Sequence, residues 1–170
     1  LSIYPDMRLS VSCTTRLPRE GETAGKDYQF VSERLFRRKL SAGDFAEWAE
    51  VHGSLYGTPR KALERQLARG QDVLLDIDVQ GARQIKRHLV DAVAIFVLPP
   101  SLNELRRRLS ARGTDARKTI QQRWRKARHE IQDIRGYDYF IVNRDLDDAV
   151  NRLAAIIAAE RLKVCRYIPM

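Results

Sequence analysis

Two kinds of hydrophobic pattern divide the chain at about residue 72. Before that point, short runs such as FAEWAEV (45–51) alternate apolar and polar positions, which predicts strands with one buried face. After it, DVLLDID (72–78) and AVAIFVL (92–98) are nearly continuous apolar runs, typical of parallel strands covered on both faces. A helical pattern follows each of these two runs. The alternation of strand and helix predicts an α/β fold built on a parallel sheet.

Residues that favour helix starts suggest the bounds of the elements. Ser32, Thr58, Ser101 and Asp145 each precede a helical pattern and carry a side-chain oxygen that can accept a hydrogen bond from the first turn. A long, arginine-rich helix is expected over 115–134. Strands are expected at 9–13, 28–31, 45–51, 54–57, 72–78, 92–98 and 137–142. The strand-rich part from 16 to about 57 is therefore interpreted as an insertion on the parallel sheet.

Composition narrows the class of protein. With 170 residues and 44% hydrophobic residues, the chain is long enough to bury the core of one domain. Its two cysteines are far apart, which argues against a disulfide framework and favours the cytoplasm. No apolar run reaches the length of a membrane span, so no membrane partner is expected. A net charge of +9 indicates an anionic partner.

Residues 13–20, CTTRLPRE, are the first candidate site, and we call them the elbow. Arg16 and Arg19 lie on either side of Pro18, whose ring restricts its own backbone and that of the preceding residue. Guanidinium groups on a stiffened backbone are suited to bind an anion through paired, charge-assisted hydrogen bonds. We therefore expect the elbow to bind an anion.

The glycine-containing stretch GETAGKD (21–27) looks like a phosphate-binding loop but does not match one. Such a loop needs four residues between its glycines and a serine or threonine after its lysine. Here three residues separate the glycines, and Asp27 follows Lys26. A carboxylate in that place would repel phosphate, so we do not expect this stretch to bind one.

Two aspartates stand at the end of a predicted buried strand. Asp76 and Asp78 are separated by one residue at the carboxyl end of 72–78, which is where open α/β sheets bind ligands. They could hold the water shell of a metal or accept hydrogen bonds from a ligand. Alternatively, one caps the next helix and the other sits in solvent. Two carboxylates on one face favour the functional interpretation.

The helices after residue 101 are rich in arginine. Arg108 and Arg112 are four residues apart and so lie on one helix face, and Arg123 follows on the next helix. Between residues 105 and 128 the only acidic residue is Asp115. Unpaired basic side chains favour a polyanion, either a nucleic acid or a nucleoside triphosphate.

Six segments, taken together and in order, resemble the guanylate kinase family from about residue 9 to 160: SVSCTTRLPREGETAGKDYQFVS, FAEWAEVHGSLYGT, DVLLDIDVQGA, IFVLPPS, RLSARGTD and YFIVN. The resemblance implies a single domain with a three-layer, P-loop-kinase-like α/β fold and a parallel sheet. Its core would comprise 1–15, 71–111 and 136–170. A mixed, β-rich GMP-binding insertion would occupy 16–70, and a helical lid 112–135.

The resemblance also implies how GMP would be bound. Its phosphate would contact Arg16 and Arg19 together with the hydroxyls of Tyr28 and Tyr56, and Glu22 would orient an arginine. The guanine edge would be read by carboxylates and hydroxyls at Ser12, Glu47, Thr58 and Asp76. Guanine carries N–H donors where adenine carries a lone pair, so a carboxylate there discriminates between the two bases by roughly 10⁴ or more.

On the ATP side, the resemblance implies catalytic and lid arginines at Arg108, Arg112 and Arg123, which would offset charge on the transferred phosphoryl group. Asn143 would lie near the adenine, and Asp78 would orient Mg²⁺ through water. The phosphate oxygen of GMP would itself attack, so no side chain acts as a nucleophile. Two residues depart from the family pattern: Arg144 adds charge near the expected adenine pocket, and Trp124 is larger than the expected aliphatic residue, which helix packing would explain.

The largest departure from the family concerns its phosphate-binding loop, which matches no segment of these residues. The chain retains the GMP side and the lid but lacks the main cradle for ATP. We expect a polypeptide of these 170 residues to have little or no kinase activity, and the full gene product to be active.

Two other functions are alternatives to GMP phosphorylation by ATP. A guanylate-kinase-like module without catalysis would recognise phosphorylated peptides, but Arg108, Arg112 and Arg123 favour the enzyme. A nucleic-acid binder rests on the net charge alone, because the basic run contains no aromatic platform and no known motif. The expected partners are therefore GMP and ATP in the cytoplasm, with no nucleic acid, and a homo-oligomer remains open.

Overall fold

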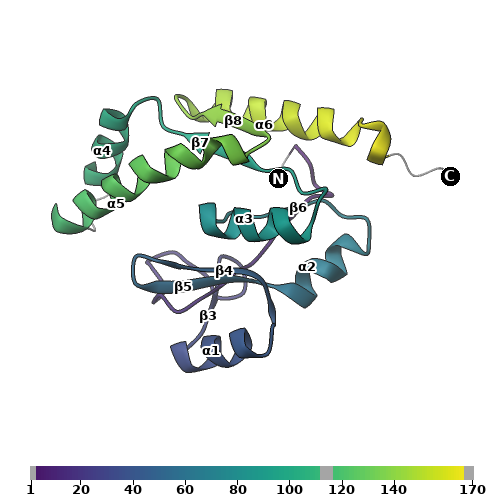
Figure 1. Cartoon of the computed structure of the whole chain (residues 1–170), viewed down its shortest axis with the longest axis horizontal. Coiled ribbons are helices and arrows are strands. Elements are labelled where there is room, and N and C mark those ends of the chain that lie inside the picture. Colours follow the sequence, from purple (N-terminus) through teal and green to yellow (C-terminus); the bar gives the residue numbers. More distant parts are fainter. Residues whose placement is uncertain (1–2, 112–116, 167–170) are drawn as a thin grey trace. The chain divides into compact units, whose positions relative to one another are not determined.

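The computed structural model describes residues 3–111 and 117–166, and the chain divides into two compact units (Figure 1). Unit 1 comprises Leu1–Ala92 and unit 2 comprises Val93–Met170. Both combine strands and helices, in keeping with the expected α/β class. The predicted division into core, insertion and lid groups the residues differently, and it stays a prediction.

A mixed four-stranded sheet in the order β3-β2-β5-β4 forms one part of unit 1. Its strands are β2 (Cys13–Thr14), β3 (Gln29–Phe30), β4 (Phe45–Val51) and β5 (Ser54–Pro59). Strands β4 and β5 form a hairpin whose two turn residues, His52 and Gly53, both have positive φ, as a tight hairpin turn requires. The alternating pattern of 45–51 is confirmed, since Phe45, Glu47 and Ala49 are buried.

The core of this sheet forms beneath α1 (Glu33–Ser41). Cys13, Phe36, Phe45 and Leu55 make one buried cluster, in which the Phe36 and Phe45 rings stack 4.5 Å apart. The predicted N-cap at Ser32 is confirmed, because its hydroxyl accepts a hydrogen bond from the Leu35 backbone N–H.

A second, two-stranded parallel sheet in unit 1 pairs β1 (Arg8–Leu9) with β6 (Val73–Leu74). The single strand expected at 9–13 is wrong: the chain pairs with β6 at 8–9 and with β3 and β5 at 13–14, so residues 10–12 pass from one sheet to the other. The strand expected over 72–78 is likewise shorter, ending at Leu74.

Two helices complete unit 1, α2 (Arg60–Leu67) and α3 (Val79–His88). The prediction that Thr58 caps α2 is wrong, because the N-cap is Pro59, which makes no side-chain cap hydrogen bond. Thr58 instead belongs to β5, where its hydroxyl bonds to Glu47. Helix α3 begins after Asp78, which is its N-cap.

Unit 2 has a parallel pair of strands, β7 (Ile95–Leu98) and β8 (Tyr139–Val142). Its helices are α4 (Leu102–Ala111), α5 (Arg117–Glu130), α6 (Leu146–Arg161) and two short 3-10 helices at Ile131–Gly136 and Val164–Arg166. The predicted caps at Ser101 and Asp145 are confirmed. The expected cover on both faces is not met at Val97 and Phe140, which are 58% and 62% exposed.

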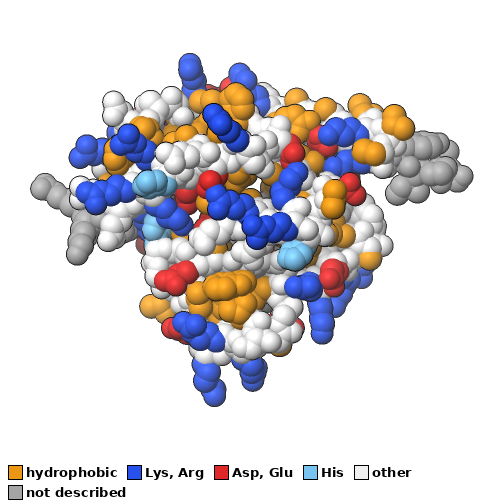
Figure 2. Space-filling view, in the orientation of Figure 1, with side chains coloured by type: hydrophobic (Ala, Val, Ile, Leu, Met, Phe, Trp, Pro, Cys, Tyr) orange, Lys and Arg blue, Asp and Glu red, His pale blue; other side chains and the backbone are white. Residues whose placement is uncertain are grey.

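The surface carries the charge that the composition predicts. Lys and Arg side chains project over the face in view, among acidic and hydrophobic ones (Figure 2). None of the helices in the described part of the chain is both long and apolar enough to cross a membrane.

Candidate functional site

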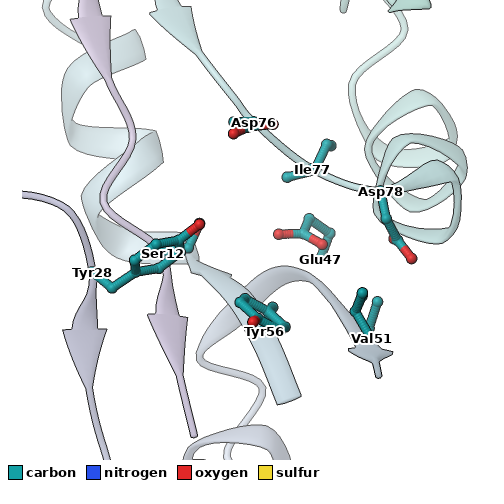
Figure 3. A pocket seen from close by; sticks show the side chains of 9 residues that line it. Ser12, Tyr28, Glu47, Val51, Tyr56, Asp76, Ile77 and Asp78 are labelled. Carbon is teal, nitrogen blue, oxygen red and sulfur yellow. The ribbon is translucent and has the colours of Figure 1, made fainter. Parts of the chain in front are cut away.

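A cavity of about 250 Å³ lies within unit 1, where its two sheets and the start of α3 come together (Figure 3). Its walls combine carboxylates, tyrosines and small apolar residues. They are Ser12, Tyr28, Glu47, Ala49, Val51, Tyr56, Asp76, Ile77 and Asp78. Six of the predicted site residues therefore line one cavity: Ser12, Tyr28, Glu47, Tyr56, Asp76 and Asp78.

Glu47 is a buried carboxylate in the wall of this cavity, only 4% exposed. One of its oxygens, Oε1, accepts hydrogen bonds from both the Thr58 backbone N–H (2.9 Å) and the Thr58 hydroxyl (2.6 Å). The other oxygen, Oε2, accepts none from any described residue. Burial raises the pKa of Glu47, the Thr58 bonds lower it, and the charge of Asp78 raises it further. Strand β5 thus holds the carboxylate by one oxygen and leaves the other for a ligand.

Asp76 and Asp78 approach the cavity from the segment after β6, as Figure 3 shows. Asp78 caps α3: its Oδ1 accepts from the backbone N–H groups of Gln80 (3.1 Å) and Gly81 (3.0 Å). Asp76 is exposed. The alternative of one cap and one solvent-exposed aspartate is therefore observed, and both side chains nevertheless line the cavity.

The elbow arginine Arg16 is held in place by three side chains. Its guanidinium forms a two-bond ion pair with Glu22, at 2.8 and 3.0 Å, and its Nε donates to the Tyr56 hydroxyl at 3.2 Å. The same guanidinium lies 5.4 Å from the centre of the Tyr28 ring. Because Tyr28 and Tyr56 line the cavity, Arg16 is fixed at its edge.

The sequence left open which arginine Glu22 orients, and the structure shows that it is Arg16. A carboxylate oxygen of Glu22 also accepts the Arg19 backbone N–H at 2.7 Å, and this bond closes the turn at the elbow. The hydrogen bonds to Arg16 and Arg19 lower the pKa of Glu22, and Glu22 raises the pKa of Arg16. The Arg19 guanidinium is exposed and makes no hydrogen bond with a described residue.

The hydroxyl of Tyr28 interacts electrostatically with both Asp76 and Arg16. Burial raises the pKa of its hydroxyl, and the Asp76 carboxylate raises it further, while Arg16 lowers it. Its ring packs edge-on against Tyr56, with centroids 6.0 Å apart. The Tyr28 hydroxyl is therefore neutral at ordinary pH and remains able to donate a hydrogen bond.

The stretch 21–27 folds as a turn closed by its own carboxylate. Asp27 Oδ2 accepts the Thr23 backbone N–H at 2.7 Å, and the Lys26 N–H donates to the Thr23 carbonyl. The strand β3 follows it, whereas a phosphate-binding loop leads into a helix. With Asp27 where an anion would bind, the turn does not act as a phosphate cradle.

In unit 2, the candidate Arg108 has an acidic partner on its own helix, and its side chain is 37% exposed, compared with 17% for that of Arg16. Arg108 Nε donates to Glu104 Oε1 at 2.8 Å, and Arg107 pairs with the same carboxylate at 2.7 Å. These bonds lower the pKa of Glu104 to about 2. Glu104 lies one helical turn before Arg108, just outside the stretch 105–128 that contains a single acidic residue.

The remaining predicted residues of unit 2 lie on α5 and just after β8. Arg123 is half-buried on α5, and Asn143 follows β8, where its N–H donates to the Leu98 carbonyl at 2.7 Å. Arg112 lies outside the described residues. The indole N–H of Trp124 donates to the Leu102 carbonyl at 3.3 Å, so this departure from the family pattern joins α5 to α4.

The residues that could hold a metal are few. Among the residues that the structure describes, no group of three or more His, Cys, Asp or Glu side chains could hold an ion. The Asp76 and Asp78 carboxylates are hard oxygen donors, which suit Mg²⁺ held mostly by nucleotide phosphates and water. The donor set therefore fits a water-mediated contact and not a protein cage.

Comparison with known proteins gives the family. A family model described as guanylate kinase matches residues 2–160. The chain belongs to the guanylate kinase family. It is 49% identical over 168 residues to the guanylate kinase of Geobacter sulfurreducens, covering 99% of this chain and 83% of that protein. It is 51% identical over 166 residues to that of Syntrophotalea carbinolica, covering 98% and 79% respectively.

The structural comparison agrees with the guanylate kinase assignment. The crystal structure of guanylate kinase from Anaplasma phagocytophilum superposes with a TM-score of 0.84 at 41% identity, covering 97% of this chain and 81% of that one. The family resemblance and the fold class predicted from the sequence are both confirmed.

One residue that packs against the Glu47 carboxylate is not indicated by the sequence. Gly81, the glycine of DVQGA, lies directly behind the Glu47 carboxylate. The motif that contains it was quoted for the family resemblance, but a glycine in a helix carries no charge or hydrogen-bonding side chain that would attract attention. Its packing against Glu47 shows only in three dimensions.

Proposed function

We propose that the cavity of unit 1 binds GMP and reads its guanine through Glu47. The observation that carries the proposal is the buried carboxylate held by Thr58 through Oε1 alone, with Asp76 and Ser12 on the same cavity. Guanine presents N1–H and N2–H₂ donors, which a carboxylate accepts. Adenine presents a lone pair at N1 and would leave the carboxylate unpaired, at a free-energy cost of about 1–3 kcal/mol or more.

The phosphate of GMP would bind at the elbow. Four of the five N–H groups of Arg16 are already used, by Tyr56, by the Leu17 carbonyl and twice by Glu22. The phosphate would therefore take the remaining N–H of Arg16, the Arg19 guanidinium, and the hydroxyls of Tyr28 and Tyr56. Glu22 would keep the Arg16 fork oriented while the anion arrives.

The reaction that we propose is transfer of the γ-phosphoryl group from ATP to GMP. A phosphate oxygen of GMP forms a bond to the γ-phosphorus, the bond from that phosphorus to the β–γ bridging oxygen breaks, and ADP leaves with the electron pair. Arg108, Arg112 and Arg123 would offset charge on the transferred group, and Asn143 would lie near the adenine. Magnesium, when bound, supplies positive charge to the triphosphate, and Asp78 would hold one of its waters.

We further propose that a polypeptide of these 170 residues binds GMP but transfers phosphate slowly. The closed turn at 21–27 offers no cradle to the triphosphate, and no other stretch of the sequence has the spacing of a phosphate-binding loop. GMP binding depends on unit 1 residues that are all present. A cytoplasmic location, with GMP and ATP as small-molecule partners, is part of this proposal.

Binding calorimetry on the 170-residue chain tests the GMP site. GMP should bind more tightly than AMP, and Glu47→Gln should weaken GMP binding by about 10- to 100-fold while AMP binding changes little, since a charge-assisted hydrogen bond is worth about 1.5–3 kcal/mol. Equal affinity for the two nucleotides would contradict the proposal. If the chain did not bind GMP but bound a phosphoserine peptide tightly, the result would favour the non-catalytic module instead.

A coupled assay for ADP formation tests the second part of the proposal. A sample shown by mass spectrometry to contain only these 170 residues should bind GMP and yet show little or no turnover with ATP. Turnover at an ordinary enzymatic rate, about 1–100 per second for kinases, would refute it.

A further inference from the structure

Helix α3 runs beside the strand that carries Glu47, and one side chain joins the two by two hydrogen bonds. Gln84 Nε2 donates to the Trp48 carbonyl at 2.7 Å, and the Trp48 N–H donates to Gln84 Oε1 at 3.2 Å. A single side-chain amide thus satisfies both backbone groups of the residue next to Glu47, much as a neighbouring strand would. At the start of the helix, Asp78 accepts the Gly81 N–H and holds the first turn.

Gly81 lies one turn before Gln84 on this helix, facing the carboxylate. A Cβ at position 81 would overlap Glu47 Oε2, and it would lie 3.1 Å from Glu47 Cδ and 3.3 Å from Ile77 Cβ. The end of a glutamate side chain can usually swing away from such an overlap. Glu47 is not free to do so, because it is 4% exposed and its Oε1 is held by two donors of Thr58.

Backbone conformation does not explain this glycine. Gly21, Gly25 and Gly53 have positive φ, where a side chain would be strained, whereas Gly81 has ordinary helical geometry. Glycine is a poor helix former, and alanine would favour α3. The gain from glycine at this position is therefore the space next to Glu47 Oε2.

We propose that Gly81, held against β4 by Gln84, is a specificity-determining positioning residue for the guanine-reading carboxylate. The missing side chain leaves Oε2 where it can accept the N–H donors of a purine base, and any larger residue would displace it. This inference rests on the proposed binding of GMP at the cavity. It extends the site to a residue that makes no hydrogen bond to Glu47.

The test compares nucleotide affinities of the Gly81→Ala chain by calorimetry. GMP binding should weaken by about tenfold or more, because small displacements of a binding group have large effects. AMP shares the ribose and phosphate but not the N–H donors, so its affinity should stay within about twofold. The ratio of the GMP and AMP affinities should thus fall, while thermal unfolding stays cooperative.

Two controls separate positioning from general disturbance. Gly136→Ala makes the same chemical change where a Cβ would meet nothing within 4 Å, and it should leave both affinities unchanged. Glu47→Asp shortens the side chain and withdraws its carboxylate from residue 81. In that background, Gly81→Ala should cost GMP binding less than threefold, because coupled residues show non-additive effects.

The outcomes distinguish this inference from the proposed function. If the unchanged chain does not prefer GMP to AMP, both fail. If it does, and Gly81→Ala keeps the full preference or loses as much in the Glu47→Asp background, only the role of Gly81 is refuted. Should Gly81→Ala not fold, Gln84→Ala replaces it: a lowered GMP preference with unchanged AMP binding supports the inference, and an unchanged preference overturns it.

Discussion

The elbow of unit 1 and the basic helices of unit 2 both carry arginines, but they hold them differently. Arg16 and Glu22 form their ion pair with side chains only 17% and 18% exposed, and Tyr56 and Tyr28 add further contacts. In unit 2, Arg107 and Arg108 share the Glu104 carboxylate with side chains 70% and 37% exposed. Arg16 is enclosed by its partners, whereas Arg108 is partly exposed and Arg107 is mostly exposed.

This difference determines how well each arginine is preorganised to bind an anion. A guanidinium that is already oriented loses little conformational entropy when an anion binds to it. Exposed ion pairs contribute little to stability and exchange partners easily. We therefore expect the elbow to act as a fixed receptor for a phosphate, and the arginines of α4 to change partners when a ligand or another charge approaches.

The largest effect is expected from Arg16→Ala, which removes the enclosed arginine. GMP affinity should fall by about 10- to 100-fold, or roughly 1.5–3 kcal/mol, because a charge-assisted contact is lost and Glu22 is left facing the phosphate. Isothermal titration calorimetry measures the change. Arg37→Ala is the matched control, since Arg37 also pairs with a glutamate, at 2.6 Å, but on the exposed face of α1.

The expected contrast can fail in two ways. An unchanged GMP affinity in Arg16→Ala would mean that the elbow is only structural. An equal loss in Arg37→Ala would mean that net charge, and not the enclosed geometry, attracts the nucleotide. Arg16→Lys keeps the charge without the planar fork and should fall between the two.

An intermediate effect is expected from pH through Glu47. Burial raises the pKa of this carboxyl above its ordinary value of about 4.3, so the charged form that accepts N–H donors is lost as pH falls through the raised pKa. The preference for GMP over AMP should therefore decline by up to tenfold per pH unit on the acid side of that pKa. Both affinities are measured from the ordinary pKa of about 4.3 up to about pH 8, and their ratio cancels the titration of the shared phosphate.

The same pKa shift determines the sign of a stability effect. In the free chain, the folded state binds the Glu47 proton more tightly than the unfolded state, so stability declines as pH rises from the ordinary pKa through the raised one. Glu47→Gln has no such group and should show neither this decline nor the pH dependence of nucleotide preference. A preference for GMP that is constant across this range in the unchanged chain would contradict the assignment to Glu47.

The smallest effect is expected from Glu104→Gln, which breaks the exposed ion pairs of unit 2. The midpoint of thermal unfolding should fall by at most ~2 °C at neutral pH, the scale of single exposed ion pairs. Because the pKa of Glu104 is lowered to about 2, its contribution is complete above the ordinary pKa and is lost as pH falls towards 2. GMP affinity should not change, and a loss like that of Arg16→Ala would remove the contrast between the units.

The sequence predicted the types of the elements and their capping residues better than it predicted which strands pair with one another. The alternation in 45–51 and the capping residues Ser32, Ser101 and Asp145 depend on local chemistry, and all were confirmed. The strand at 9–13 was wrong because its two ends pair with different sheets, which no local pattern reveals.

The site shows the same limit. The cavity contains the predicted Ser12, Glu47 and Asp76, each recognisable by a polar side chain. Thr58 was assigned both to the guanine site and to a helix cap, because a Thr-Pro pair fits either setting. The structure shows it beside Glu47 and not at the cap, and its contact with the base stays a prediction. The sequence does not indicate Gly81, because the role that we propose for it depends on the absence of a side chain next to Glu47, 34 positions away in the chain.

Residues 10–12 join the two sheets of unit 1 by a short length of backbone. The Ser10 N–H donates to the carbonyl of Leu74 in β6 at 3.0 Å. Two residues later, the Ser12 carbonyl accepts the N–H of Gln29 in the mixed sheet at 2.9 Å. The cavity is lined both by Asp76, which follows β6, and by Tyr28 and Tyr56, which lie just before β3 and within β5 of the mixed sheet. A ligand that contacts residues of both sheets would stabilise their association. Ligand binding to the cavity and the folding stability of unit 1 are therefore linked.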